Sequence, residues 1–311
     1  AKQCLDIFHH LGVQAICELG AGTGRFACDV LRELHKWNAA PACYYIYEIS
    51  PHLREQQQIF LQTHCPELFD RFVWLPQLPQ NFVGIMIANE VLDALPTGCF
   101  RVENNTIKER CVSWDGHQFR WQNCKPLSNQ LDQAAQIIQK QYQLAEGYES
   151  EINLDLPPFM HSLSHALSEG VILLADYGYG QREYYHPERC RGTLTCFYQH
   201  RHHDNPFVWP GLQDITTHVD FTRVIEHAAE TGCSLLGFTS QASFLLACGL
   251  IERAQQEEKK MSEKEKFTLH QAIKTLTLPT EMGERIKIMA LGKNINCALL
   301  GFKLQDRRRD L

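Results

Sequence analysis

The sequence lacks the cysteine patterns that would assign it to a zinc-binding or thiol-redox class. None of its 13 cysteines forms a Cys-x-x-Cys pair, the spacing typical of structural zinc sites and redox motifs. An odd, scattered set of cysteines is typical of buried thiols in a reducing compartment. We therefore expect buried, reduced cysteines.

Long apolar runs and an excess of positive charge are also missing. The longest apolar run, Phe244–Ile251, is far shorter than the roughly 20 residues that a membrane-spanning helix needs. The net charge of −6 argues against nonspecific binding to nucleic acid. We expect neither a membrane nor a nucleic-acid partner, and we expect the basic residues 307–309 to form a frayed, solvated tail. The chain opens at Ala1 almost directly before the first expected strand, which suggests a processed or truncated N-terminus.

A glycine-rich stretch organises the rest of the chain. The apolar segment 13–19 contains the acid Glu18 near its end and is followed by Gly20, Gly22 and Gly24. Apolar residues then recur at helical spacing, so the stretch predicts a strand, a tight loop and a helix. Glycines let the backbone approach a ligand closely, and the N-terminus of the helix offers unpaired N–H groups.

The dinucleotide-binding motif Gly-x-Gly-x-x-Gly would need a third glycine at position 25. This chain has Arg25 there, so the motif is incomplete. The spacing Gly-x-Gly-x-Gly behind an acid resembles motif I of the class I S-adenosylmethionine (SAM) methyltransferases. An acid there suits a ligand that carries an ammonium group and a cationic sulfur. The alternative is a structural glycine turn without a ligand. The residues that we expect to bind the cofactor here are Glu18, Gly20, Ala21, Gly22 and Gly24.

A second acid follows at the end of the next predicted strand, residues 44–48. Glu48 lies where such folds hold ribose hydroxyls, although it could also be a surface carboxylate. Ser50 and Pro51 predict the start of a helix that extends to about Leu61. Ile49 is expected beside the cofactor.

A third strand is expected at residues 72–75, and it ends where the adenine ring rests in methyltransferases. Trp74 and Leu75 are therefore cofactor candidates, although Trp74 is equally compatible with a place in the core.

The continuous apolar run 82–88 predicts a central parallel strand, which ends in Asn89, Glu90 and, three residues later, Asp93. Polar groups at this end of a central strand face the ligand crevice. We assign Asn89 to the cofactor site and the two acids to catalysis. If the segment is helical, the i, i+3 spacing places both carboxylates on one face.

Residues 97–168 interrupt the α/β alternation and are expected to form an insertion. Hairpin strands are predicted at 99–102, 107–114 and 118–121, and helices at 131–145 and 159–167. A fifth buried strand, 170–178, carries Asp176. Residues 178–216, which include Asp214, are expected to form a long structureless substrate loop. Its histidines, His200, His202 and His203, lack a further ligand set, so no metal is expected.

The last third is expected to complete a seven-stranded Rossmann-like sheet with helices on both faces. Asp220 predicts the N-cap of a helix over 221–231 that stops at Gly232. Strands are predicted at 233–240 and 298–304, and lid helices near 243–256, 262–276 and 281–291. The whole chain is thus interpreted as one α/β catalytic domain, with residues 1–96 as the SAM-binding half and 169–311 as the second half.

Several blocks of the sequence resemble the MidA (DUF185) family, which includes the mitochondrial arginine methyltransferase that assists assembly of respiratory complex I. They are residues 18–24, 48–54, 88–96, 176–179, 192–194, 210–216, 219–221 and 282–285. The resemblance implies a SAM-bound enzyme that methylates the ω nitrogen of arginine on a protein, such as a complex I subunit or its bacterial counterpart. It also implies the bacterial cytoplasm or, alternatively, the mitochondrial matrix. Family members usually carry a further N-terminal segment, which this chain lacks.

The chemistry of the acceptor ranks the acidic residues. A guanidinium is protonated at neutral pH and must be held by carboxylates. Glu90 and Asp93 are the first candidates, with Asp176, Asp214 and Asp220 behind them. Two other functions stay open, a non-catalytic SAM-binding assembly factor and a small-molecule methyltransferase. The oligomeric state is not predicted.

Overall fold

The computed structural model describes residues 1–199 and 201–311, and the chain divides into two compact units. The first, which we call the sheet unit, consists of residues 1–91, 160–176 and 225–310. The second, the insertion unit, consists of residues 92–159 and 177–224 together with Leu311. The expected insertion at 97–168 thus shares a unit with residues 177–224, while its last residues belong to the sheet unit.

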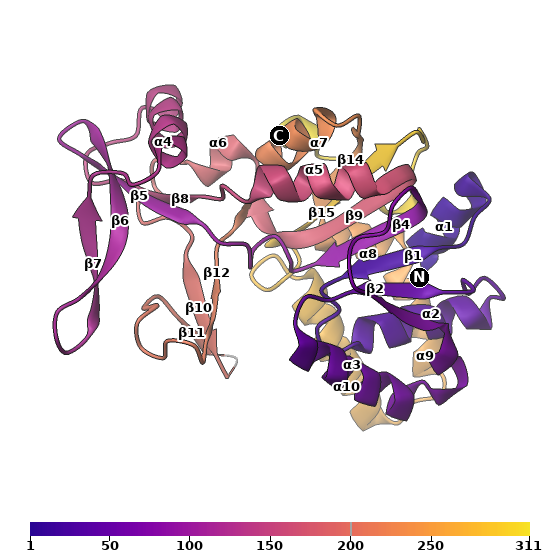
Figure 1. The fold of residues 1–311 in the computed structure, drawn as a ribbon. Coiled ribbons are helices and arrows are strands. Elements are labelled where there is room, and N and C mark those ends of the chain that lie inside the picture. Colours follow the sequence, from indigo (N-terminus) through magenta and orange to yellow (C-terminus); the bar gives the residue numbers. More distant parts are fainter. Residues whose placement is uncertain (200) are drawn as a thin grey trace. The chain divides into compact units, whose positions relative to one another are not determined.

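The sheet unit is built on seven strands in the order β14-β15-β9-β4-β1-β2-β3 (Figure 1). In chain order they are β1 (Ile16–Leu19), β2 (Tyr44–Tyr47), β3 (Phe72–Leu75), β4 (Phe82–Asn89), β9 (Leu167–Tyr179), β14 (Ser234–Ser240) and β15 (Ile286–Lys293). Neighbouring strands in the part of the sheet ordered β9-β4-β1-β2-β3 pair in parallel. β14 and β15 pair with each other in antiparallel orientation. The prediction of a class I SAM methyltransferase fold is confirmed.

Helices cover both faces of this sheet, which explains why its central strands are apolar on both sides. α2 (Arg25–Lys36) and α3 (Pro51–His64) cover one face, and α5 (Leu156–Ala166) and α7 (Phe221–Ala229) the other (Figure 1). The predicted caps are confirmed. The Ser50 hydroxyl accepts a hydrogen bond from Leu53 N at 3.3 Å, and Asp220 accepts bonds from the first backbone N–H groups of α7 at 3.1 and 3.3 Å.

The position of the seventh strand corrects the sequence analysis. β15 occupies residues 286–293, where a helix over 281–291 was expected, while residues 298–304 hold only the 3-10 turn η2 (Leu300–Phe302). Lys287 explains the error, because it interrupts the apolar run of a strand that is buried on both faces. Its side chain is only 5% exposed, and its ammonium group donates to the carbonyl of Glu284.

The sheet unit contains further helices outside the α/β core. α1 (Lys2–Leu11), which was not predicted, precedes β1, and the short turn η1 (Pro66–Arg71) precedes β3. The helix expected over 243–256 is two helices, α8 (Gln241–Ala247) and α9 (Leu250–Glu258), divided by Gly249 at φ +85°. α10 (Glu263–Thr277) begins with a capping box between Ser262 and Glu265. Their action as a lid remains a prediction.

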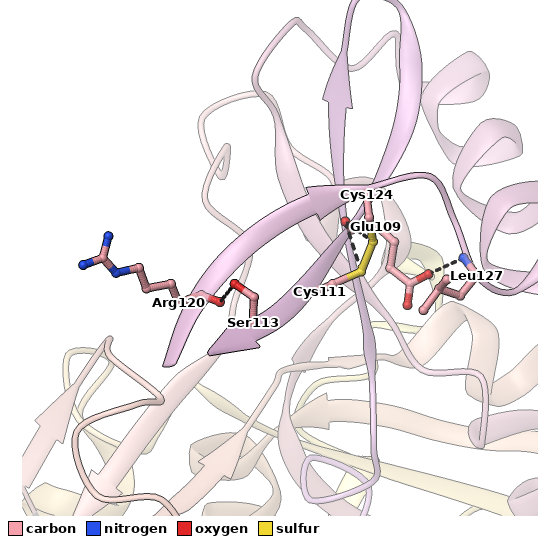
Figure 2. Close-up of a disulfide and its surroundings, with 6 residues drawn as sticks. All are labelled: Glu109, Cys111, Ser113, Arg120, Cys124 and Leu127. Carbon is pink, nitrogen blue, oxygen red and sulfur yellow. Dashed lines mark hydrogen bonds between the residues drawn. A yellow bond between two sulfur atoms is a disulfide. The ribbon is translucent and has the colours of Figure 1, made fainter. Parts of the chain in front are cut away.

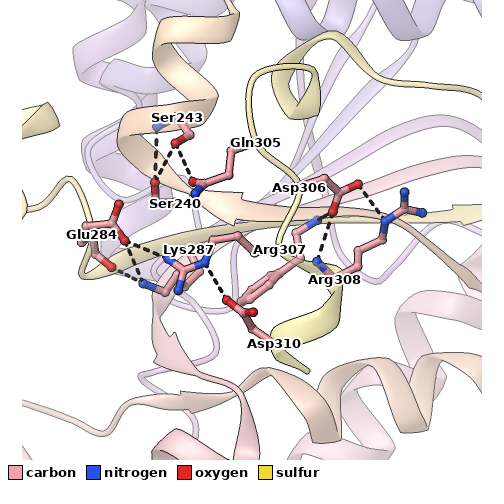
Figure 3. A network of polar contacts seen from close by, with 10 residues as sticks. Ser240, Ser243, Glu284, Lys287, Gln305, Asp306, Arg307, Arg308 and Asp310 are labelled. Carbon is pink, nitrogen blue, oxygen red and sulfur yellow. Dashed lines mark hydrogen bonds and ion pairs between the residues drawn. The ribbon is translucent and has the colours of Figure 1, made fainter.

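The basic C-terminal residues are not a frayed tail. Arg307 bonds the carboxylates of Glu284 at 2.9 Å and Asp310 at 2.7 Å, and Arg308 pairs with Asp306 at 2.7 Å (Figure 3). The backbone N–H of Arg307 also donates to the carbonyl of Phe238 in β14 at 2.6 Å. These contacts tie the last turn, η3 (Arg308–Asp310), to the sheet.

The insertion unit contains two small antiparallel sheets. One has the order β7-β6-β5-β8 and packs against α4, and the other has the order β11-β10-β12. Their strands are β5 (Gly98–Glu103), β6 (Thr106–Trp114), β7 (Phe119–Cys124), β8 (Glu149–Ile152), β10 (Thr195–Tyr198), β11 (Arg201–His203) and β12 (Asp214–Thr216). β13 (Val219–Asp220) instead pairs in parallel with the end of β9, and the helices are α4 (Asn129–Tyr142) and α6 (Gln181–Tyr184). The prediction of a structureless loop over 178–216 is therefore wrong. Its strands have only three or four residues each, too few to show an alternating pattern.

One pair of cysteines departs from the expectation of reduced thiols. Cys111 in β6 and Cys124 in β7 form a disulfide with a Cα–Cα distance of 6.5 Å (Figure 2). The register pairs Cys111 with Gln122 and Glu109 with Cys124, so the two cysteines are diagonal neighbours in the hairpin. The other eleven cysteines are free.

The contacts of the C-terminal segment predict a stability difference between two neighbouring arginines. Arg307→Ala removes hydrogen bonds to two carboxylates and should lower the free energy of unfolding by about 1–2 kcal/mol. Arg309→Ala is the matched control, because Arg309 is exposed and makes no ion pair within the described residues. Urea denaturation of both variants measures the difference, and equal midpoints would contradict a role for the Arg307 contacts.

Candidate functional site

The glycine loop after β1 lies where the strand order reverses between β1 and β4, the edge at which such sheets bind ligands. Gly22 and Gly24 have φ values of +52° and +82°, which favour glycine, and a Cβ atom at Gly22 would meet open space. Gly24 is the N-cap of α2 and provides no side-chain cap. The backbone of the loop and the first turn of α2 can therefore face a ligand directly.

A network of hydrogen bonds connects this loop to the ends of β2 and β3. The amide nitrogen of Gln57 donates to the carbonyl of Gly22 and to the carboxylate of Glu48, both at 3.0 Å. Its amide oxygen accepts from the indole nitrogen of Trp74, also at 3.0 Å, and Glu48 accepts a further bond from Ser50 N at 3.0 Å. Three predicted cofactor residues, Gly22, Glu48 and Trp74, are thus brought together by one amide group.

Gln57 was missed by the sequence analysis. It lies in α3 and is completely buried, four residues before the completely buried Leu61. That spacing on the inner face of a helix was the available signal, since a buried amide must satisfy its hydrogen bonds.

Glu18 lies inside the core rather than on the surface of the loop. Its side chain is 2% exposed, and its carboxyl group accepts a hydrogen bond from the hydroxyl of Tyr44 at 2.7 Å. Burial raises the pKa of Glu18 to about 7, against the opposing effect of this hydrogen bond. Glu18 therefore joins β1 to β2.

The other predicted cofactor residues differ in their exposure and contacts. Ala21 is buried in the glycine loop, whereas Ile49 after β2 is 82% exposed and Asn89 at the end of β4 is exposed. The carbonyl of Leu75 at the end of β3 accepts a bond from the guanidinium of Arg54 at 2.7 Å. All of them belong to the sheet unit.

Glu90 is held in an unusual backbone conformation directly after β4. Eight non-glycine residues of the described chain have positive φ, and Glu90, at +50°, is the only charged one, beside five asparagines and two glutamines. Strain of this kind costs on the order of 1–3 kcal/mol and is retained where the surroundings enforce it. Here Glu90 N donates to the carbonyl of Ala175 at 2.8 Å, and Val91 N to the carboxylate of Asp176 at 3.2 Å.

The environments of these two acids differ. Asp176 is completely buried and fixes the turn after β4, so it positions Glu90. Glu90 is exposed, yet enough protein surrounds its carboxyl group to raise its pKa by desolvation, while a hydrogen bond with Asn89 acts in the opposite direction. A Cβ atom at Gly20 would lie 3.1 Å from the side chain of Val91, so the Glu90 turn adjoins the glycine loop.

Asp93 and Asp214 belong to the insertion unit. The segment from Glu90 to Pro96 consists of bends and turns, so the conditional argument that a helix places Glu90 and Asp93 on one face is wrong. Asp93 is 5% exposed, and its carbonyl accepts a bond from Thr217 N at 3.1 Å. Asp214 is exposed in β12, opposite Phe197 of β10.

The β10-β11-β12 sheet contains buried polar atoms that lack hydrogen-bond partners within the described residues. They are the hydroxyl of Thr195, both ring nitrogens of His203 and the amide oxygen of Gln213. His202 pairs with Asp204 at 3.3 Å, and His200 lies outside the described residues. Buried groups of this kind call for an explanation such as a ligand or water.

Comparison with known proteins assigns the chain to a family. Residues 1–239 match the model of the family described as "Putative S-adenosyl-L-methionine-dependent methyltransferase". The chain belongs to this family. Membership of this family confirms the predicted cofactor, SAM. It is also consistent with the resemblance to MidA proteins. No curated protein matches the chain.

Two crystal structures of proteins from Burkholderia thailandensis are similar over the whole chain. The first, bound to S-adenosylhomocysteine, is 33% identical with a TM-score of 0.92, over 100% of this chain and 79% of the other. The second, a native structure, is also 33% identical, with a TM-score of 0.93 over 100% of this chain and 82% of the other. Within the described residues, no helix is long and apolar enough to cross a membrane.

The raised pKa of Glu18 predicts a pH-dependent stability. The folded protein keeps this group protonated up to about pH 7, whereas the unfolded chain releases the proton near its ordinary pKa of 4.5, so stability falls as pH rises between the two values. Glu18→Gln keeps an acceptor for Tyr44 and removes the titration. The variant should gain up to about 3 kcal/mol relative to the native protein from pH 4 to pH 8. Denaturation across this range tests the idea, and a constant difference would refute it.

Proposed function

We propose that this protein transfers a methyl group from SAM to an ω nitrogen of arginine on a protein substrate. The observation that carries the proposal is Glu90, an acid held in the left-handed region at the ligand edge of the sheet, with its carboxylate exposed. A fixed carboxylate beside the glycine loop suits a cationic acceptor that must be oriented toward the cofactor.

The residues of the sheet unit fit SAM. The open space beside Gly22 and the uncapped start of α2 suit the methionine end of the cofactor, which brings an electrophilic methyl group on a sulfonium. Glu48 uses one hydrogen bond on each carboxylate oxygen and retains lone pairs for the ribose hydroxyls. Trp74, whose indole nitrogen is held by Gln57, is positioned to border the adenine ring.

Glu90 would bind the guanidinium and orient one nitrogen toward the methyl group. Desolvation raises the pKa of Glu90, and a bound guanidinium would reverse this effect, because an opposite charge favours the ionised carboxylate. When SAM is bound, its sulfonium would supply the methyl group and leave as the neutral thioether of S-adenosylhomocysteine. The proton released by the methylated nitrogen would pass to Glu90 or to water. Asp176 acts through the backbone of Val91 and keeps Glu90 in place.

The insertion unit would contact the rest of the protein substrate. Asp93 and Asp214 are the acidic candidates for contacts with the substrate within this unit. The carboxylate of Asp214, by contrast with the buried polar atoms of this sheet, is exposed. We place the substrate contacts on residues 178–216 for these reasons.

The first prediction of this proposal concerns cofactor binding. Gly22→Val places a β-branched side chain in the space that the ligand should occupy and forces an unfavourable φ, so SAM binding should be lost while the fold is retained. Gly12→Val is the matched control, because Gly12 also has a positive φ, +68°, and open space around it, but lies at the end of α1. Calorimetry with SAM and circular dichroism test both variants. Equal SAM affinities would refute the assignment of the loop.

The second prediction concerns Glu90. Glu90→Gln keeps the size of the side chain and removes its charge, so turnover should fall about 100-fold, the loss typical of a single electrostatic contact in a reacting site. SAM affinity should stay within a few-fold. Glu55→Gln, at an exposed position of α3, is the control and should leave both quantities unchanged.

The acceptor is identified by incubating the protein with radiolabelled SAM and a bacterial or mitochondrial lysate. Label on a protein and methylarginine in its mass spectrum would support the proposal. Label on a small molecule would contradict the proposal and support a small-molecule methyltransferase. SAM binding without any transfer of label would contradict it as well and support a non-catalytic assembly factor.

A further inference from the structure

A second cluster of polar side chains lies away from the glycine loop, on the helices that cover the opposite face of the sheet. His161 of α5 lies beside His227 in the last turn of α7 and Glu230 just after it. Nε2 of His161 is 2.8 Å from one oxygen of Glu230, and Nδ1 of His227 is 3.3 Å from the other. All three residues belong to the sheet unit.

The packing of α5 fixes this arrangement. Ser164, which is completely buried, donates its hydroxyl to the carbonyl of Thr231 at 3.3 Å and lies 3.0 Å from the sulfur of Cys233. His161 precedes Ser164 by three residues and therefore lies on the same side of the helix. The contact that anchors α5 to the turn after α7 thus directs His161 toward Glu230.

The three donor groups have the composition and spacing of a transition-metal site. One ligand atom of each residue lies within 4.8 Å of the other two. A tetrahedral zinc ion with bonds of about 2.0–2.2 Å needs donor atoms about 3.3–3.6 Å apart, so only small side-chain rotations are required. His161 and His227 are partly buried and Glu230 is exposed, which leaves room for a water molecule as the fourth ligand.

We propose that His161, His227 and Glu230 bind one zinc ion. Two imidazoles and one carboxylate suit zinc and similar transition metals, whereas magnesium and calcium prefer oxygen ligands alone. The site lies near the edge of the sheet from which β9 and β14 begin, opposite the edge of the glycine loop. A bound ion would therefore fasten α5 to α7 and take no direct part in methyl transfer.

Zinc binding to the full chain, first stripped of metal with a chelator, tests the proposal by calorimetry. We expect one equivalent of zinc with micromolar or tighter affinity, and cobalt in its place should give the visible absorption of a tetrahedral site. His161→Ala and His227→Ala should each weaken binding at least about tenfold. The matched control is His165→Ala, one turn further along α5, where Nδ1 contacts the carbonyl of His161.

A second readout separates a specific site from scattered binding to other histidines. Zinc should raise the melting temperature of the native protein and of His165→Ala by a few degrees, and should leave His161→Ala unchanged, because only a ligand of the folded state shifts the transition. Circular dichroism without metal shows whether each variant folds. Zinc binding that survives in both His161→Ala and His227→Ala would identify an adventitious ion only and overturn the proposal. The absence of zinc binding to the native protein would leave the cluster as a hydrogen-bonded contact and overturn it as well.

Discussion

The position of the candidate site depends on one hydrogen bond to a buried acid, from the backbone N–H of Val91 to the carboxylate of Asp176. A fully buried carboxylate is costly unless donors satisfy it, so this bond constrains the chain where it leaves β4. The constraint forces Glu90 into the left-handed region and brings Val91 against the glycine loop. There the side chain of Val91 leaves only 3.1 Å for a Cβ atom at Gly20. A glycine after β1 and a strained acid after β4 are thus two consequences of one interaction between neighbouring strands.

The sequence predicted the elements whose pattern is local. The glycine loop, the first five strands, the hairpins of the insertion unit and the caps at Ser50 and Asp220 depend on residues close in the chain. Other features depend on partners that are distant in sequence. In its buried strand Lys287 donates to the carbonyl of Glu284 and lies near the carboxylate of that residue, contacts that the pattern of residues alone does not reveal. The disulfide of Cys111 depends likewise on the register of the β6–β7 hairpin.

The candidate site was predictable to the same extent. The positions of Gly22, Glu48 and Trp74 follow from the ends of three parallel strands, which meet at one edge of any such sheet. Gln57, which joins them, shows in the sequence only as a residue spaced four positions before Leu61, and that spacing does not reveal which groups its amide contacts. Asp93 is a similar case. Its spacing from Glu90 would have placed both acids on one face of a helix, but the backbone conformation that Asp176 imposes on Glu90 prevents a helix from starting.

Glu18 and Glu48 show why sequence position alone does not assign a role to an acid. Both lie at the ends of neighbouring strands and both are at least nine-tenths buried. Glu18 has one neutral donor, the hydroxyl of Tyr44, so desolvation dominates and its pKa rises to about 7. Glu48 has a donor on each oxygen, from Ser50 N and Gln57. The first acid therefore joins two strands, while the second is held by donors from the start and the middle of α3, and its contact with a ribose remains a prediction.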